Sequence, residues 1–233
     1  MNKKRIVIFT GAGISAESGL KTFRGDDGLW EGHRVEDVAT PEAWKKNPAL
    51  VQEFYNQRRK SVLAAKPNSA HLSLVQLEEK FQVNIITQNI DDLHERAGST
   101  NILHLHGQIV KSQSSIDPSL VYSIQGDEIK MGDKCTKDSQ LRPYIVWFGE
   151  AVPAMIEANQ LAKQADILIV IGTSLQVYPA ANLVYEVGEQ CTIYLIDPAA
   201  DKYNTPEQTV TIAQKATVGV PDIVQHLLQH TGI

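Results

Sequence analysis

Short apolar runs rich in β-branched residues alternate with segments of helical periodicity along most of the chain. Such runs are typical of strands buried on both faces of a parallel sheet. They lie at 6–9, 83–87, 167–171 and 192–196, and we expect the last of these to be the final strand. Apolar residues spaced three and four apart predict helices at 41–46, 48–63, 68–80, 154–164, 179–187 and 221–229. This alternation predicts an α/β fold with a doubly wound, Rossmann-like parallel sheet.

Residues 111–142 break the pattern, because they are polar and include several serines and glycines. A segment of this composition cannot bury a core of its own, so we expect a small inserted module there. A core strand follows at 142–148. Its end places Val146, Trp147 and Phe148 beside Gly149, which would suit a peptide that adds itself as a strand, or is simply a strand before a turn.

The first strand runs into a glycine turn in the order G-x-G-x-x-A. Gly11 would permit the tight turn, Gly13 would let backbone approach a pyrophosphate, and Ser15 would cap a helix that carries an early acid at Glu17. Such turns also simply join a strand to a helix. The polar stretch 22–28 that follows does not look like a strand. It predicts a loop folded over a ligand, or an ordinary surface loop.

Polar residues also follow the later strands. In an open parallel sheet, ligands bind at the carboxyl ends of strands. Asn89 and Asp91 could therefore bind ribose hydroxyls or orient a water, or they form a turn that caps a helix. The turn at 172–174 could likewise offer N–H and O–H groups to a nucleotide.

His104 and His106 would share one face of a regular strand. His106 precedes a glycine that lets a ligand come close, and an imidazole suits proton transfer near neutral pH. A structural role and a metal pair are the alternatives, although the pair has no obvious third ligand nearby.

Tyr55 and Arg58 lie three residues apart and so share one face of the helix at 48–63. They could receive a carboxylate, with the guanidinium supplying charge and the phenol a second hydrogen bond. The alternative is a core tyrosine beside a solvated arginine. Arg59 and Lys60 are expected to face solvent.

Composition narrows the functional classes. The chain has 233 residues and a net charge of −5, which gives no reason to expect a nucleic-acid partner. It has no apolar run of membrane-spanning length, and the basic start followed by a short apolar run is better interpreted as a core strand than as a signal peptide. Cys135 and Cys191 are far apart, which suits a reducing cytoplasm, so we expect a cytoplasmic protein.

Together these segments resemble the sirtuin family of NAD-dependent protein-lysine deacylases. The matching stretches occur in order over nearly the whole chain: G-A-G-I-S-A-E-S-G at 11–19, T-F-R at 22–24, T-Q-N-I-D at 87–91, H-L-H-G at 104–107, R-P-x-x-V-W-F-G-E at 142–150 and G-T-S-L at 172–175. The stretch F-Y-N-Q-R at 54–58 resembles bacterial sirtuins that remove succinyl and malonyl groups.

The resemblance implies one sirtuin-type domain over 1–233. Its NAD-binding part would be 1–110 and 143–233, and its small domain would be the module 111–142 with the helices of 41–63. NAD would be consumed as a co-substrate. It would be held by Gly11, Ala12, Gly13, Glu17, Thr22, Phe23, Arg24, Trp30, Gln88, Asn89, Ile90, Asp91, Gly172, Thr173, Ser174, Asp197 and Ala216.

The same resemblance implies the chemistry. An acyl-lysine of a protein or peptide would thread between the two parts and pair its backbone near Val146, Trp147, Phe148 and Gly149. Its acyl oxygen would attack the ribose carbon as nicotinamide leaves, with His106, Asn89 and Asp91 as the catalytic residues. His106 would act as general base on a ribose hydroxyl. The products would be free lysine, nicotinamide and O-acyl-ADP-ribose, and we expect a monomer.

Two departures from the family pattern matter. Sirtuins usually hold zinc in the inserted module through four cysteines, whereas here Ser114 stands where the first ligand would be and only Cys135 remains near the later pair. One thiol does not make a tetrahedral site, so we expect no zinc. The family often has asparagine after the last strand, where this chain has Asp197, a carboxylate that could accept from ribose hydroxyls.

Two alternative functions stay open from the sequence. One is an NAD hydrolase or ADP-ribosyl transferase on the same scaffold, and the other is a non-catalytic NAD-binding module. With the resemblance in view, the carboxylate-receptor hypothesis for Tyr55 and Arg58 is favoured, and it predicts removal of succinyl and malonyl groups besides acetyl.

Overall fold

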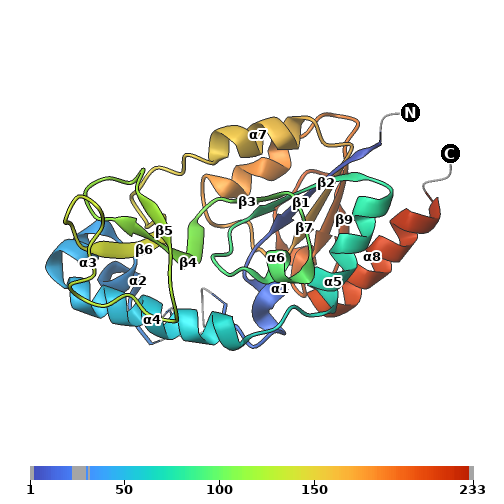
Figure 1. The fold of residues 1–233 in the computed structure, drawn as a ribbon. Coiled ribbons are helices and arrows are strands. Elements are labelled where there is room, and N and C mark those ends of the chain that lie inside the picture. Colours follow the sequence, from blue (N-terminus) through green and yellow to red (C-terminus); the bar gives the residue numbers. More distant parts are fainter. Residues whose placement is uncertain (1–2, 23–29, 31, 231–233) are drawn as a thin grey trace.

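The computed structural model describes residues 3–22, 30 and 32–230, which form two sheets (Figure 1). The larger sheet has the strand order β3-β2-β1-β7-β8-β9, and all of its neighbouring strands are parallel. Its strands are β1 (Arg5–Thr10), β2 (Gln82–Thr87), β3 (Ile102–His104), β7 (Ile167–Ile171), β8 (Thr192–Ile196) and β9 (Val210–Ile212). The predicted doubly wound parallel sheet is confirmed.

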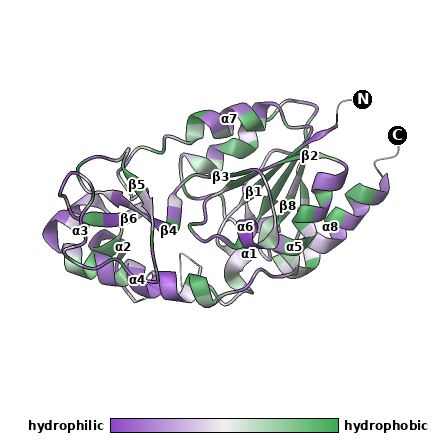
Figure 2. Ribbon diagram, viewed as in Figure 1, coloured by the Kyte–Doolittle hydropathy of each residue, from purple (hydrophilic) through white to green (hydrophobic). Residues whose placement is uncertain are grey.

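Helices cover both faces of this sheet. One face packs against α5 (Ser69–Gln76) and α8 (Ala216–His230), and the other against α7 (Met155–Lys163) and the 3₁₀ helix η2 (Ala180–Tyr185). Successive residues of a strand point to opposite faces. Ile6 and Ile8 of β1 therefore join one apolar cluster, and Val7 and Phe9 join the other. The apolar strands lie inside a more polar outer layer (Figure 2).

The small domain lies beside the carboxyl edge of the large sheet (Figure 1). Its helices are α2 (Val35–Val38), α3 (Pro41–Lys46) and α4 (Pro48–Ala64), and its antiparallel strands are β4 (Gly107–Ser114), β5 (Val121–Ser123) and β6 (Leu141–Ile145). A third apolar cluster joins them through residues of α4, β4 and β6. The helices of 41–63 thus pack with strands β4 and β6.

The boundaries of the inserted module differ from the predicted 111–142. The small sheet begins at Gly107 and ends at Ile145, because β6 pairs antiparallel with β4 instead of joining the large sheet. The strand expected at 142–148 stops early for a local reason. The Glu150 carboxylate accepts a hydrogen bond from the Trp147 amide at 2.8 Å and turns the chain.

Other predictions about single elements were wrong. The segment 192–196 is not the last strand, because β9 follows it; β9 has only three residues and is largely exposed, so it carries little hydrophobic signal. The helix expected at 179–187 is the 3₁₀ helix η2. The first helix, α1 (Gly13–Ala16), is a single turn with no side-chain cap. Arg59 does not face solvent but is fully buried, and its Nε donates to the carbonyl of Ile109 at 2.7 Å.

The remaining short elements are η1 (Leu77–Glu79), α6 (Leu93–Ala97) and η3 (Ala200–Lys202). Within the described part of the chain, no helix is long and apolar enough to cross a membrane. The strand order places a topological switch between β1 and β7, since the chain winds from β1 outward to β2 and β3 and later from β7 outward to β8 and β9. Ligands of open α/β sheets bind outside the carboxyl ends of the strands at such a switch.

Candidate active site

A cavity of about 530 Å³ opens at this switch, between the carboxyl edge of the large sheet and the small domain. It brings together most of the residues that the sequence predicts for the site. These are Gly11, Ala12, Gly13, Thr22, Trp30, Tyr55, Arg58, Gln88, Asn89, Ile90, Asp91, His106, Val146, Trp147, Phe148, Gly149, Gly172, Thr173, Ser174 and Asp197.

Of the predicted residues that the structure describes, Glu17 and Ala216 do not line the cavity. Phe23 and Arg24 lie outside the described residues. The carboxylate of Glu17 is turned toward the start of α8, where its Oε2 accepts from the Thr217 hydroxyl at 2.6 Å. Ala216 is buried in the core at the same helix end, at 5% exposure. Glu17 therefore joins the end of α1 to the start of α8 by hydrogen bonds, Ala216 packs in the core, and neither residue lines the cavity.

The two glycine turns at the switch pack backbone against backbone. The Gly13 amide donates to the Gly172 carbonyl at 2.8 Å, and Gly172 has a φ of +62°. A Cβ on Gly172 would lie 2.4 Å from the Ile14 nitrogen, and one on Gly11 would lie 2.7 Å from the Gly172 oxygen. Each turn needs glycine because a Cβ there would collide with the backbone of the other turn. This close packing brings both turns to the same wall of the cavity.

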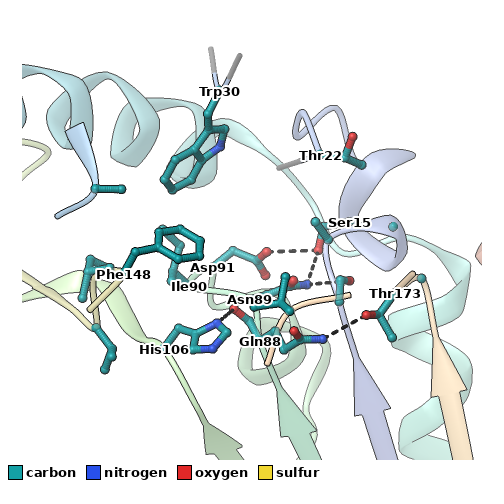
Figure 3. Close-up of a pocket in the computed structure, with 18 of the residues that line it drawn as sticks. Ser15, Thr22, Trp30, Gln88, Asn89, Ile90, Asp91, His106, Phe148 and Thr173 are labelled. Carbon is teal, nitrogen blue, oxygen red and sulfur yellow. Dashed lines mark hydrogen bonds between the residues drawn. The ribbon is translucent and has the colours of Figure 1, made fainter. Parts of the chain in front are cut away.

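Asn89 and Asp91 follow β2 and are held by a buried hydroxyl (Figure 3). The Ser15 hydroxyl donates to Asp91 Oδ2 at 3.0 Å and lies 3.3 Å from Asn89 Nδ2, which also donates to the Gly11 carbonyl at 3.1 Å. Asp91 Oδ1 accepts from the Leu93 amide at 3.1 Å, so the expected turn at the start of α6 is present as well. Burial raises the pKa of the Asp91 carboxyl, and the hydrogen bonds from Leu93 and Ser15 oppose that shift.

Ser15 therefore has a role that the sequence analysis missed. It was expected to cap a helix, but its side chain joins the β1 turn to the polar segment after β2. Serine near a helix start is ordinarily a cap, so local sequence alone favours the wrong assignment.

His106 lies on the opposite side of the cavity from Trp30 (Figure 3). Its Nδ1 is 3.1 Å from the carbonyl oxygen of Gln88. A carbonyl can only accept, so Nδ1 carries the proton and Nε2 keeps a lone pair in the neutral ring. Burial lowers the pKa of His106, and the hydrogen bond to Gln88 opposes this. The geometry and the environment both favour a neutral base at pH 7.

The small-domain end of the cavity is aromatic. The Arg58 guanidinium carbon lies 4.4 Å from the ring centroid of Trp30, a stacked cation–π distance. Tyr55 is fully buried, and its hydroxyl accepts from Trp147 Nε1 at 3.2 Å. Burial raises the pKa of Tyr55 and keeps the phenol protonated, so the hydroxyl proton can be donated to a ligand.

The segment 146–149 reaches the cavity as predicted, but it is not a free strand end. The amides of Val146, Trp147 and Phe148 donate within the chain, to the His106 carbonyl, the Glu150 carboxylate and the Ala39 carbonyl. A peptide that pairs here would have to use other backbone groups of the segment. Phe148 is 45% exposed and lines the cavity.

The far end of the cavity carries Asp197, at the end of β8. Its Oδ1 accepts from the Tyr203 hydroxyl and from the Ala199 amide, both at 2.8 Å. Asp197 and Tyr203 both line the cavity. Tyr203 was missed because it follows a polar stretch with no periodicity, and only the turn η3 brings it back to Asp197.

In the inserted module, Ser114 and Cys135 belong to a hydrogen-bonded cluster that also includes Ser139. Ser114 Oγ is 2.9 Å from Ser139 Oγ, which is 3.2 Å from Cys135 Sγ. Ser114 Oγ also accepts from the amides of Ile116 and Asp117. These contacts join the end of β4 to the 135–139 turn. The expectation that no zinc is bound stays a prediction.

Comparisons with known proteins match nearly the whole chain. A model of the Sir2 family matches residues 11–179. An NAD-dependent protein deacylase of Helicobacter pylori is 54% identical over 97% of this chain and 98% of its own length, and one of Bacteroides thetaiotaomicron is 49% identical over 97% and 98%. Among solved structures, a Sir2 homolog–NAD complex is 39% identical, has a TM-score of 0.86 and covers 97% of this chain and 90% of its own. A Sir2 homologue mutant bound to ADP-ribose is 38% identical, has a TM-score of 0.87 and covers 97% and 93%.

Proposed function

The chain belongs to the Sir2 family of NAD-dependent protein deacylases, and from that premise we propose that it removes succinyl and malonyl groups from protein lysines in preference to acetyl. The observation that carries this proposal is the cation at the aromatic end of the cavity. Arg58 lies against Trp30, beside the buried hydroxyl of Tyr55. An acetyl group offers neither residue a charge to bind, whereas a succinyl or malonyl group ends in a carboxylate.

The two side chains are suited to a carboxylate in different ways. A guanidinium presents several N–H donors and stays charged at every pH the protein meets. Trp147 donates to the Tyr55 oxygen at 3.2 Å, so the tyrosine proton is left for another acceptor. Both donors line the cavity within one turn of α4, because their positions differ by three residues.

At the sheet end of the cavity, a second set of residues is suited to bind NAD. The paired glycine turns at 11–13 and 172–174 bring backbone close to one wall, and the Asp197 carboxylate, fixed by Tyr203, suits ribose hydroxyls. When bound, NAD would supply the glycosidic bond that breaks when the acyl oxygen of the substrate attacks the ribose carbon and nicotinamide leaves. Gln88, Asn89 and Asp91 would bind the nicotinamide side, since all three line the cavity beside His106.

His106 would be the general base that accepts a proton from a ribose hydroxyl of NAD. Its Nδ1–H is committed to the Gln88 carbonyl, so Nε2 would accept the proton of a ribose hydroxyl during acyl transfer. The lowered pKa of the ring keeps this nitrogen unprotonated at neutral pH. Small-domain packing around the aromatic end would exclude water, which favours acyl transfer over hydrolysis of NAD.

The experiment is mass spectrometry of matched acetyl-, malonyl- and succinyl-lysine peptides incubated with NAD. We expect kcat/KM for the succinyl peptide to exceed that for the acetyl peptide by about ten- to a hundredfold, because a charged hydrogen bond contributes roughly 1.5–3 kcal/mol. O-acyl-ADP-ribose is the expected product. Free ADP-ribose would instead identify an NAD hydrolase, and a modified protein would identify an ADP-ribosyl transferase.

The variant Arg58→Met tests the assigned residue. It should lose most of the activity on succinyl and malonyl peptides and keep most of the activity on the acetyl peptide. Lys60→Met is the matched control, since it removes the same charge from an exposed position of the same helix. An equal loss on all three peptides would make Arg58 a structural residue and would refute the proposed preference.

A further inference from the structure

His104 is a histidine for which the proposed chemistry has no use, yet its side chain is only 6% exposed and contacts the backbone of Asn89, a residue that lines the cavity. Its Nδ1 is 3.0 Å from the carbonyl oxygen of Asn89, and its Nε2 is 2.7 Å from Glu95 Oε1. No regular strand runs through both His104 and His106, so the condition for their sharing one strand face is not met. β3 ends at His104, and the two rings then meet successive residues of the segment after β2.

Both partners of His104 can only accept hydrogen bonds. A backbone carbonyl has no proton to donate. Burial raises the pKa of the Glu95 carboxyl, but the hydrogen bond and charge of His104, a backbone hydrogen bond and the charge of Lys111 together lower it. Both ring nitrogens must therefore be donors, which requires the imidazolium form. His106 differs, because only its Nδ1 has a carbonyl partner and its Nε2 faces the chemistry.

We infer that His104 is a positioning residue, held as an imidazolium between the Asn89 carbonyl and the Glu95 carboxylate, and that it fixes the Gln88–Asn89 segment against the nicotinamide end of NAD. Two imidazoles thus anchor successive carbonyls, His106 that of Gln88 and His104 that of Asn89. Glu95 in turn comes from α6, so the pair joins the helix that begins behind Asp91 to the end of β3.

The charges around the ring are consistent with this assignment. The carboxyl groups that face it are Glu95 and the buried Asp91. Burial raises the pKa of Asp91, and a positive His104 opposes that shift. His94 also faces it, but burial lowers the pKa of that ring well below its ordinary value, so it adds no competing charge. Lys111 faces Glu95 and helps to keep it ionised.

Nuclear magnetic resonance of the ring nitrogens tests the charge state without any substrate, so it stands apart from the proposed function. At pH 7 we expect two N–H groups on His104 and one, on Nδ1, on His106, with the signals assigned by comparison with His104→Asn. In Glu95→Gln, the second N–H of His104 should be lost. A neutral His104 ring in the unmodified protein would overturn the inference.

Two isosteric variants then test positioning, and this part rests on the proposed function. The amide of asparagine can replace Nδ1, and the amide of glutamine can replace Nε2. His104→Asn should keep the bond to the Asn89 carbonyl and bind NAD within about threefold of the unmodified protein. His104→Gln should keep only the bond to Glu95 and bind NAD about tenfold more weakly, as measured by calorimetry.

The kinetic readout is KM for NAD, which is compared with the change in Tm of the same variants. For His104→Gln we expect KM for NAD to rise about tenfold, while the change in Tm matches that of His104→Asn. Equal losses of NAD affinity in both variants, in step with Tm, would assign His104 a purely structural role and refute the inference. Failure of the proposed function would appear differently, as unchanged NAD binding with no acyl transfer by the unmodified protein.

Discussion

The two ends of the cavity hold their side chains by different means. At the sheet end, Asn89, Asp91 and His106 are fixed by hydrogen bonds of 3.0–3.3 Å to backbone and to Ser15, next to turns where glycine backbone packs on glycine backbone. At the small-domain end, Tyr55 and Arg58 are held mainly by aromatic rings. The ring centroids of Trp30, Phe54 and Tyr55 lie 5.0–6.2 Å apart, and that of Trp147 lies 6.5 Å from Tyr55.

This difference separates two tasks. Backbone turns and buried hydrogen bonds tolerate little displacement, which suits proton transfer and cofactor geometry. Long side chains on a helix can change without moving the backbone, which suits a pocket that selects among acyl groups. Substitutions at the sheet end should therefore affect every substrate, and those at the small-domain end should discriminate among them.

The largest effect is expected at the sheet end. His106→Ala should lower kcat by about 10²- to 10⁴-fold on acetyl and succinyl peptides alike, because the general base is removed. NAD binding, measured by calorimetry, should stay within a few fold. Full activity of this variant would mean that another group accepts the proton. It would then be wrong to assign proton transfer to His106 at the sheet end of the cavity.

The glycine contact should give the next largest effect. In Gly172→Ala, a Cβ would lie 2.4 Å from the Ile14 nitrogen at a residue with φ of +62°, so backbone must move. We expect a loss of about 3–4 kcal/mol in unfolding free energy and a Tm lower by roughly 10 °C.

Gly126→Ala is the matched control for that contact. It also has a positive φ, of +90°, but its Cβ would meet no described atom within 4 Å. It should cost only about 1–2 kcal/mol. Equal losses in the two variants would mean that the backbone contact between the turns contributes nothing.

A smaller and selective effect is expected at the aromatic end. Trp147→Phe removes the Nε1 donor to the Tyr55 hydroxyl and frees that hydroxyl to turn away from a ligand. Activity on the succinyl peptide should fall about fivefold, in line with one lost hydrogen bond, while activity on the acetyl peptide changes less than twofold. Trp44→Phe, at a neighbouring ring 5.8 Å away, should leave the ratio unchanged.

The pH profile sharpens the same comparison. Burial lowers the pKa of His106 from its ordinary value of 6.5, and the base works only when it is unprotonated. The acid limb of kcat/KM should therefore lie below pH 6.5, with activity lost as pH falls through it. It should coincide for acetyl and succinyl peptides, because the sheet end sets it. An acid limb with its midpoint above pH 6.5 would contradict the conclusion that burial lowers the pKa of His106.

Metal removal should have the smallest effect. The side chains of Ser114, Ser139 and Cys135 bond to one another, so we expect no stoichiometric zinc by elemental analysis. A strong chelator should shift Tm by less than about 1 °C, since no metal–ligand bonds would be lost. Bound zinc at one per chain would overturn this prediction.

The local pattern of apolar and polar residues was sufficient to predict much of the fold and many residues of the site. The apolar runs at 6–9 and 167–171 predict β1 and β7, because a strand buried on both faces must be apolar at successive positions. The family motifs predicted most of the residues that line the cavity, since residues that follow parallel strands meet at one edge of the sheet. Sequence also predicted that Tyr55 and Arg58 reach the same cavity, because helical spacing alone sets their common face.

Only the tertiary structure decided which partner each polar side chain has. Ser15 bonds to Asp91, 76 residues away, Tyr203 returns to Asp197 through a turn, and Arg59 is buried against the carbonyl of β4 residue Ile109. These contacts join elements brought together by the sheet order and the small-domain packing, so no periodicity in one segment records them. The same reason explains β6, whose apolar residues suit either sheet and whose partner is chosen by the antiparallel pairing with β4.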